Sequence, residues 1–82
     1  MRTYPTSTAN KNVPKGVFLL AEQAAMSGEI VTTYYSTEDG KLWRVVDWIY
    51  SKPYPVMPFE VCHITGDTER TLEFRISQFF GR

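Results

Sequence analysis

Cysteine and histidine are the side chains best suited to catalysis or metal binding, and this 82-residue sequence has one of each, the adjacent Cys62 and His63. A nucleophilic thiol needs a base within hydrogen-bonding reach. We predict that the segment FEVCHI is a strand, in which consecutive side chains point to opposite faces. The two side chains then cannot act on each other, and Cys62 is interpreted as a small buried apolar residue.

Other catalytic and metal-binding patterns are missing from the sequence. One histidine, one cysteine and scattered carboxylates show no ligand spacing typical of a metal site. There is no glycine-rich phosphate loop and no Gly-x-Ser-x-Gly turn. We therefore expect a domain that is not an enzyme and has no catalytic residues, metal or cofactor.

The C-terminal run ERTLEFRISQFFGR raises a different chemistry, because it carries Arg70 and Arg75 within a pattern typical of a half-buried strand. Guanidinium groups on a barrel surface could line a site for an anion. Alternatively, Arg75 shares a strand face with Glu73 and belongs to a solvated surface with neighbouring charges. On a strand, Phe74 would point into the core and Arg75 away from it.

Length and composition limit the protein to a single small domain with a thin core. The hydrophobic fraction of 43% is typical of folded proteins, and nine basic residues balance nine acidic ones. An anion site would therefore be local, because no global positive field exists. A single cysteine, no signal-peptide pattern and no apolar run long enough to span a membrane favour a cytoplasmic protein with no membrane partner.

We expect a flexible N-terminal arm at residues 1–12 and one domain at residues 13–82. A short helix is predicted at residues 14–27, begun by Pro14 and ended by Gly28. Its apolar stripe follows the helical spacing i, i+3, i+4 and i+7, with Val17, Leu20, Ala21 and Ala24.

The sequence after this helix is predicted to form strands. EIVTTYYS and KLWRVVDWIY are β-branched and aromatic, and the Asp39-Gly40 pair between them indicates a hairpin turn. SKPYPVMP contains three prolines and is expected to be an extended connection or an edge. FEVCHI and RTLEFRI are the next predicted strands, joined by the turn TGDTE, and SQFF would add a short strand or 3₁₀ turn. The predicted fold is a mainly β domain with an N-terminal helix and a small barrel or strongly bent antiparallel sheet of four or five strands.

The order of these segments resembles the WYL domain, a bacterial regulatory module. The resemblance covers roughly residues 20–80. The motifs that carry it are an Ala24-Ala25 pair, Val31-Thr32-Thr33-Tyr34-Tyr35, Gly40, Arg44-Val45-Val46 and Phe74-Arg75-Ile76. The Trp-Tyr-Leu tripeptide that names the family is absent, and Gln78 replaces an arginine of its closing motif. The resemblance implies a five-stranded Sm-like or Src-homology-3-like barrel whose cationic channel senses nucleotides or nucleic-acid strands.

The first hypothesis for function follows from these features. It is a regulatory or accessory domain that binds single-stranded nucleic acid or a nucleotide on a barrel face. The resemblance implies that Tyr35, His63 and Arg75 face the ligand. The complete set of expected ligand-binding residues is Tyr35, Arg44, His63, Arg70, Arg75 and Gln78.

The alternative hypothesis is a protein-interaction module, an inhibitor or adaptor of phage or plasmid origin. It would use the aromatic-proline surface of WIYSKPYPVMPF, with Trp48, Tyr50, Tyr54 and Phe59. A contiguous positive groove containing Arg75 would favour the anionic ligand, whereas a broad apolar patch around Tyr54 and Phe59 would favour the protein partner. Self-association stays open on either hypothesis.

Overall fold

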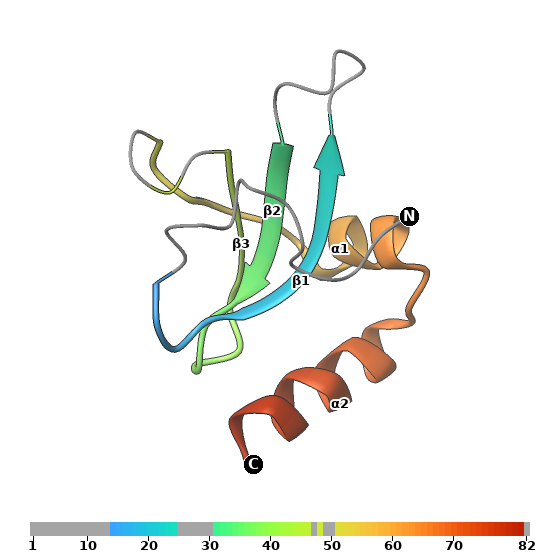
Figure 1. Ribbon diagram of the computed structural model, residues 1–82. Coiled ribbons are helices and arrows are strands. Elements are labelled where there is room, and N and C mark those ends of the chain that lie inside the picture. Colours follow the sequence, from blue (N-terminus) through green and yellow to red (C-terminus); the bar gives the residue numbers. More distant parts are fainter. Residues whose placement is uncertain (1–13, 25–30, 47, 49–50, 82) are drawn as a thin grey trace.

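The computed structural model describes residues 14–24, 31–46, 48 and 51–81, and within this described part the strands come first and the helices follow (Figure 1). The elements follow one another as β1 (Phe18–Ala24), β2 (Val31–Ser36), β3 (Leu42–Val45), β4 (Tyr54–Pro55), α1 (Pro58–Thr65) and α2 (Glu69–Phe80). The predicted antiparallel sheet is confirmed, but the helices lie at the C-terminal end of the chain. The expected N-terminal arm falls outside the described residues.

The four strands form one antiparallel sheet in the order β1-β2-β3-β4. Each strand pairs with the next along the chain, and β1 does not pair with β4. Of the two predicted forms, the barrel is wrong and the antiparallel sheet of four strands is observed, because among the described strands β1 and β4 are left at the edges. The edge strand β4 is only two residues long and ends at Pro55, which lacks the N–H needed to extend the ladder.

The predicted hairpin is confirmed as β2 and β3. Its strands pair from Thr33 with Val45 to Ser36 with Leu42. The turn between them closes with a 2.9 Å hydrogen bond from the Gly40 N–H to the Thr37 carbonyl. Gly40 has a φ of 85°, a conformation that glycine adopts without the steric cost of a Cβ atom.

The predicted helix at residues 14–27 is wrong, because residues 18–24 of this segment form β1. Periodicity alone cannot distinguish a helix from a strand in a short segment rich in apolar residues. The helical spacing of Val17, Leu20, Ala21 and Ala24 was therefore not sufficient to predict a helix. Pairing with β2 gives every residue of β1 except Leu20 a cross-strand partner. The pairing slips between Leu19 and Ala21, and this β-bulge lets Leu20 and Ala21 both be buried.

The predicted strands FEVCHI and RTLEFRI are also wrong, because these residues form α1 and α2. Pro58 occupies the first turn of α1, where its missing N–H costs nothing. Gly66 ends the helix in the left-handed conformation with its N–H bonded to the Cys62 carbonyl at 2.8 Å. Thr68 then caps α2, its hydroxyl oxygen accepting from the Thr71 N–H at 3.1 Å.

The segment SQFF belongs to α2 as well, instead of adding a strand or a 3₁₀ turn. Leu72, Ile76 and Phe80 follow one another at intervals of four residues and pack toward the core. Phe74 lies between them in sequence but on the opposite side of the helix, where 61% of its surface is exposed. The expectation that Phe74 points to the core is therefore wrong.

The core lies between the sheet and the two helices. Its buried members are Leu20, Ala21, Tyr34, Leu42, Val61, Ile64, Leu72 and Ile76. Tyr34 belongs to this cluster, whereas the next residue, Tyr35, points to the other face of the sheet and contacts Trp48 with ring centroids 4.9 Å apart. Neither described helix is long and apolar enough to span a membrane.

Candidate functional site

The segment from β4 into α1, residues 54–59, places three large apolar side chains on the surface. Tyr54, Met57 and Phe59 are exposed to 60%, 59% and 63%, and Val56 between them packs against the core. The Val56 N–H also donates to the Leu42 carbonyl at 3.1 Å, which holds this segment along β3. We refer to residues 54–59 as the β4–α1 segment.

An open groove of 740 Å³ lies on one side of this segment, between α1 and the strands β1 and β2. Its lining residues are Gln23, Tyr34, Phe59, Glu60, Cys62, His63 and Ile64. The Tyr34 hydroxyl donates to the Gln23 Oε1 at 3.4 Å. This hydrogen bond links the two lining residues that β2 and β1 contribute to the groove. We call this cavity the α1 groove.

A second groove, of 480 Å³, lies on the other side of the segment. It is lined by Gly40, Lys41, Leu42, Trp43, Pro55, Val56 and Pro58, and we call it the β3–β4 groove. Pro58 lines this groove and the next residue, Phe59, lines the α1 groove. The β4–α1 segment therefore lies between two grooves of different character. The β3–β4 groove is lined mostly by aliphatic, aromatic or proline side chains, whereas most residues that line the α1 groove carry a polar group.

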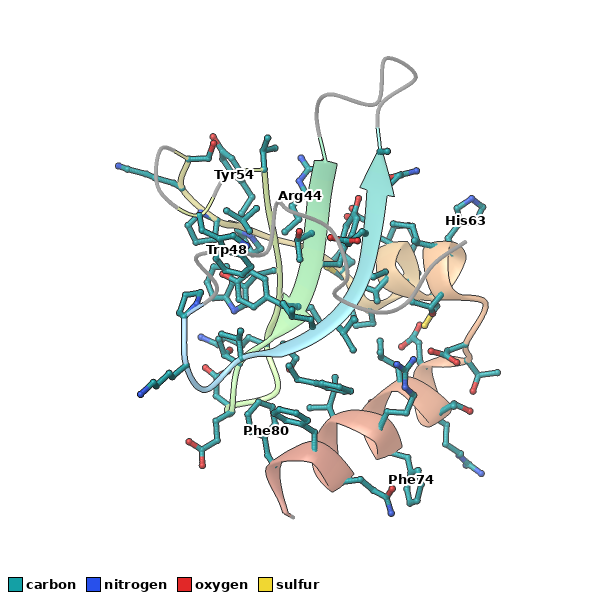
Figure 2. The ribbon with its side chains drawn as sticks, in the orientation of Figure 1. Arg44, Trp48, Tyr54, His63, Phe74 and Phe80 are labelled. Atoms are coloured by element: carbon teal, nitrogen blue, oxygen red, sulfur yellow. The ribbon has the colours of Figure 1, made fainter. Side chains whose placement is uncertain are left out.

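Arg44 lies beside the β4–α1 segment. It is exposed on β3, opposite Tyr54, and its guanidinium carbon is 6.0 Å from the centre of the Tyr54 ring. A guanidinium at this distance is attracted by the negative face of the ring. Figure 2 shows Arg44 and Tyr54 at the β3–β4 side of the sheet and His63 projecting from α1, apart from this pair.

Tyr35, an expected ligand-binding residue, is only 5% exposed and packs against Trp48. Burial raises the pKa of its phenol above the ordinary value. The neighbouring Tyr34 lines the α1 groove instead. Tyr34 and Tyr35 therefore lie on opposite faces of the sheet, and the sequence alternation identifies those faces only once the pairing is known.

Arg75, central to the anion hypothesis, is engaged within the protein. Its Nη1 atom donates to the Asp67 Oδ2 at 2.5 Å, and its guanidinium carbon is 5.8 Å from the centre of the Phe18 ring. Arg70 and Gln78 are exposed elsewhere on α2. The described cationic side chains of the expected set thus lie on β3 and α2, and they do not gather into one groove.

The aromatic-proline surface is described in part. Tyr54 and Phe59 are exposed, Trp48 is half-buried against Tyr35, and Tyr50 lies outside the described residues. Met57 is a further exposed residue of this surface. Its position between Pro55 and Pro58 was the available signal, since prolines keep this stretch out of a central strand.

Gln23 and Glu60 also line the α1 groove without having been predicted. Gln23 was not predicted as a site residue, because its segment was interpreted as a helix and not as strand β1. Glu60 was hidden because FEVCHI was interpreted as a strand, whereas the helical turn places it near His63 on the groove wall.

Two electrostatic features mark the region around α1. Burial raises the pKa of the Cys62 thiol, and the nearby carboxylates of Glu69 and Asp67 raise it further. Cys62 is half-buried and packs against the core. Among the described residues, no three or more His, Cys, Asp or Glu side chains come together in a group that could hold a metal ion.

Comparison with known proteins gives no relative: no protein-family model, curated protein or solved structure matches this chain. The resemblance to WYL domains rests on the short motifs alone. Its closing motif, Phe74-Arg75-Ile76, lies on α2 instead of on a strand.

Proposed function

We propose that this protein is a non-enzymatic protein-interaction module that inhibits or adapts a partner protein through its β4–α1 segment. One observation carries the proposal: Tyr54, Met57 and Phe59 are all more than half exposed within six residues. Aromatic residues and methionine are enriched in protein interfaces, and contiguous exposed apolar side chains mark interaction sites.

The surroundings of the segment support this proposal. Grooves on both sides could receive side chains of a partner, so that the exposed residues and the cavities would form one continuous contact surface. Pro55 and Pro58 restrict the backbone of the segment. A restricted segment loses less conformational entropy on binding, which favours affinity.

Binding of a nucleotide or single-stranded nucleic acid is the second candidate, and one observation favours it. The Arg44 guanidinium beside the Tyr54 ring combines a cation with an aromatic face, the pair that stacks a base and contacts a phosphate. The charge of Arg75, by contrast, is balanced by Asp67. The balance of these contacts favours the protein partner.

The test compares equally exposed apolar residues at two places. The purified protein, its Tyr54→Ser/Phe59→Ser double variant and a Phe74→Ser control are used to capture proteins and nucleic acids from a lysate of cells that express it. Phe74 is a matched control because its exposed fraction, 61%, is close to the 63% of Phe59. We expect one specific protein to be lost by at least roughly tenfold from the double variant only, as for the loss of an interface anchor.

Two results would contradict the proposal. One is a captured protein that Phe74→Ser loses as completely as the double variant. The other is co-purifying nucleic acid that Arg44→Ala abolishes while no protein depends on Tyr54 or Phe59, which would favour the anionic ligand.

A further inference from the structure

The walls of the α1 groove carry a formal negative charge. Glu60 lines the groove, and its other lining residues with a polar side chain are Gln23, Tyr34, Cys62 and His63. Residues 58–80, which comprise α1, α2 and the connection between them, contain four carboxylates and two guanidinium groups, and α1 supplies the helical wall of the groove. The groove therefore lies on the more acidic part of the described chain.

The second observation concerns the field inside the groove. The carboxylates of Glu69 and Asp67 add to burial in raising the pKa of the Cys62 thiol. Cys62 lines the groove, so a negative potential reaches its wall. Of the two carboxylates, Glu69 contributes more to this rise than Asp67, which is bonded to Arg75.

The groove also offers apolar surface beside the charge. Phe59 and Ile64 line the same cavity as Glu60, and Phe59 is largely exposed. Lysine and arginine side chains combine an aliphatic stem with a terminal cation, and they bury the stem on apolar surface while the cation meets an acidic or aromatic group. Arg44, the cross-strand partner of Tyr34 on β3, is placed against Tyr54 and is not among the lining residues.

We propose that the α1 groove binds a basic side chain of the partner protein, with its cation at Glu60 and its aliphatic stem on Phe59 and Ile64. This inference rests on the proposed function and specifies the chemistry of the partner. The partner segment would carry lysine or arginine next to apolar residues, and an acidic residue at the same place would be repelled.

The experiment uses the full chain labelled with ¹⁵N and two synthetic peptides, acetyl-Gly-Leu-Lys-Leu-Gly-amide and its Lys→Glu counterpart. Titration is followed by the backbone amide signals of Gln23, Tyr34 and α1. We expect the lysine peptide to shift these signals and to bind roughly three- to fivefold more tightly than the glutamate peptide, the range for a partly exposed ion pair. An arginine peptide distinguishes the two basic side chains.

Variants locate the effect. Glu60→Gln removes the charge without changing the shape, and we expect it to abolish the preference for lysine. Glu73→Gln makes the same change at an exposed position on α2 outside the groove, and the preference should persist. Both positions are exposed or half-exposed, so neither variant is expected to unfold the protein.

Equal binding of the two peptides, no shifts at the groove, or the same loss in Glu73→Gln as in Glu60→Gln would overturn the inference. The capture experiment separates this failure from that of the proposed function. If capture depends on Tyr54 and Phe59 but the peptides show no charge preference, the inference falls and the proposed function stands.

Discussion

Neighbouring residues of α2 have opposite roles at the scale of single side chains. Leu72 is almost completely buried and belongs to the core, whereas Phe74 is mostly exposed. Arg75 is half-buried between Asp67 and the Phe18 ring, while Arg70 is exposed. The contribution of each of these side chains to stability therefore depends more on the face of the helix where it lies than on its residue type.

The pair of Leu72 and Phe74 provides the first prediction. Leu72→Ala should lower the free energy of unfolding by about 2–5 kcal/mol, because it leaves a cavity in the core. Phe74→Ala should change it by less than about 0.5 kcal/mol, because a surface substitution removes few contacts. Urea unfolding followed by circular dichroism measures both. A larger loss for Phe74→Ala than for Leu72→Ala would contradict the orientation of α2.

The two arginines give the second prediction. Arg75→Ala should cost about 1 kcal/mol of unfolding free energy, because a half-buried ion pair and a contact with Phe18 are lost. Arg70→Ala at an exposed position should cost less than about 0.5 kcal/mol. A double-mutant cycle with Asp67→Asn isolates the pair, and a coupling near zero would show that Arg75 and Asp67 do not interact in solution.

At the scale of elements, the connection between α1 and α2 decides the C-terminal half of the fold. Gly66 ends α1 and Thr68 begins α2, so two helices are separated by residues 66–68 alone. Short connections of this kind favour packing of the two helices against each other. Val61 and Ile64 of α1 and Leu72 and Ile76 of α2 then bury their side chains in one core.

The third prediction concerns the turn at Gly66. Gly66→Ala should destabilise the protein by about 1–2 kcal/mol, because its φ of 84° is costly for a residue with a Cβ atom. Apart from the two neighbouring residues in the chain, no atom lies within 4 Å of the added Cβ, so the cost should come from the backbone alone. Gly66→Asn should cost less, since asparagine tolerates this conformation better. Equal losses for the two variants, measured by thermal unfolding, would contradict this explanation.

The helix pair also sets the acidity of Cys62, and this gives the fourth prediction. Removing a nearby carboxylate should lower the pKa of the thiol and increase its thiolate fraction. Glu69→Gln should therefore speed alkylation by iodoacetamide at pH 8, and the rate-against-pH curve should move to lower pH. Glu73→Gln is the control, because Glu73 does not contribute to the pKa of Cys62. Unchanged rates in Glu69→Gln would contradict the negative field in the α1 groove.

At the scale of the whole molecule, an open sheet with helices beyond its last strand leaves the β4–α1 segment on the surface. The segment lies where the chain passes from sheet to helix, so it contacts β3 through Val56 and carries exposed side chains on the other side. Formal charge is balanced over the full sequence. Neither a global field nor a gathered set of cations among the described residues directs the molecule to a polyanion.

The fifth prediction is the ionic-strength dependence of partner binding. A contact dominated by Tyr54, Met57 and Phe59 with one ion pair at Glu60 should lose only about two- to fivefold in affinity between 50 and 500 mM NaCl. Binding of a nucleic acid would fall far more steeply, because each phosphate contact releases counterions. Fluorescence anisotropy with the captured partner measures the slope, and a loss of several hundredfold would contradict the apolar interface.

Some elements could be predicted from local sequence alone. The β2–β3 hairpin followed from β-branched and aromatic residues on both sides of Asp39-Gly40, since the turn conformation depends on glycine itself. The proline-rich stretch was correctly kept out of the sheet centre, because proline lacks a backbone donor. Tyr54 and Phe59 were predicted as members of the aromatic-proline surface, because they lie in or next to this proline-rich stretch.

The remaining elements depended on tertiary contacts. The apolar residues at 17–24 fit both a helix and a strand, and only the pairing with β2 made residues 18–24 the strand β1. In the same way, Leu72, Phe74 and Ile76 fit a strand at every second residue, while Leu72, Ile76 and Phe80 fit a helix at every fourth. The sequence determined the turns and the proline-restricted segment, because those depend on the backbone chemistry of single residues. The tertiary structure decided strand or helix in the apolar runs, because that choice depends on which surface buries them.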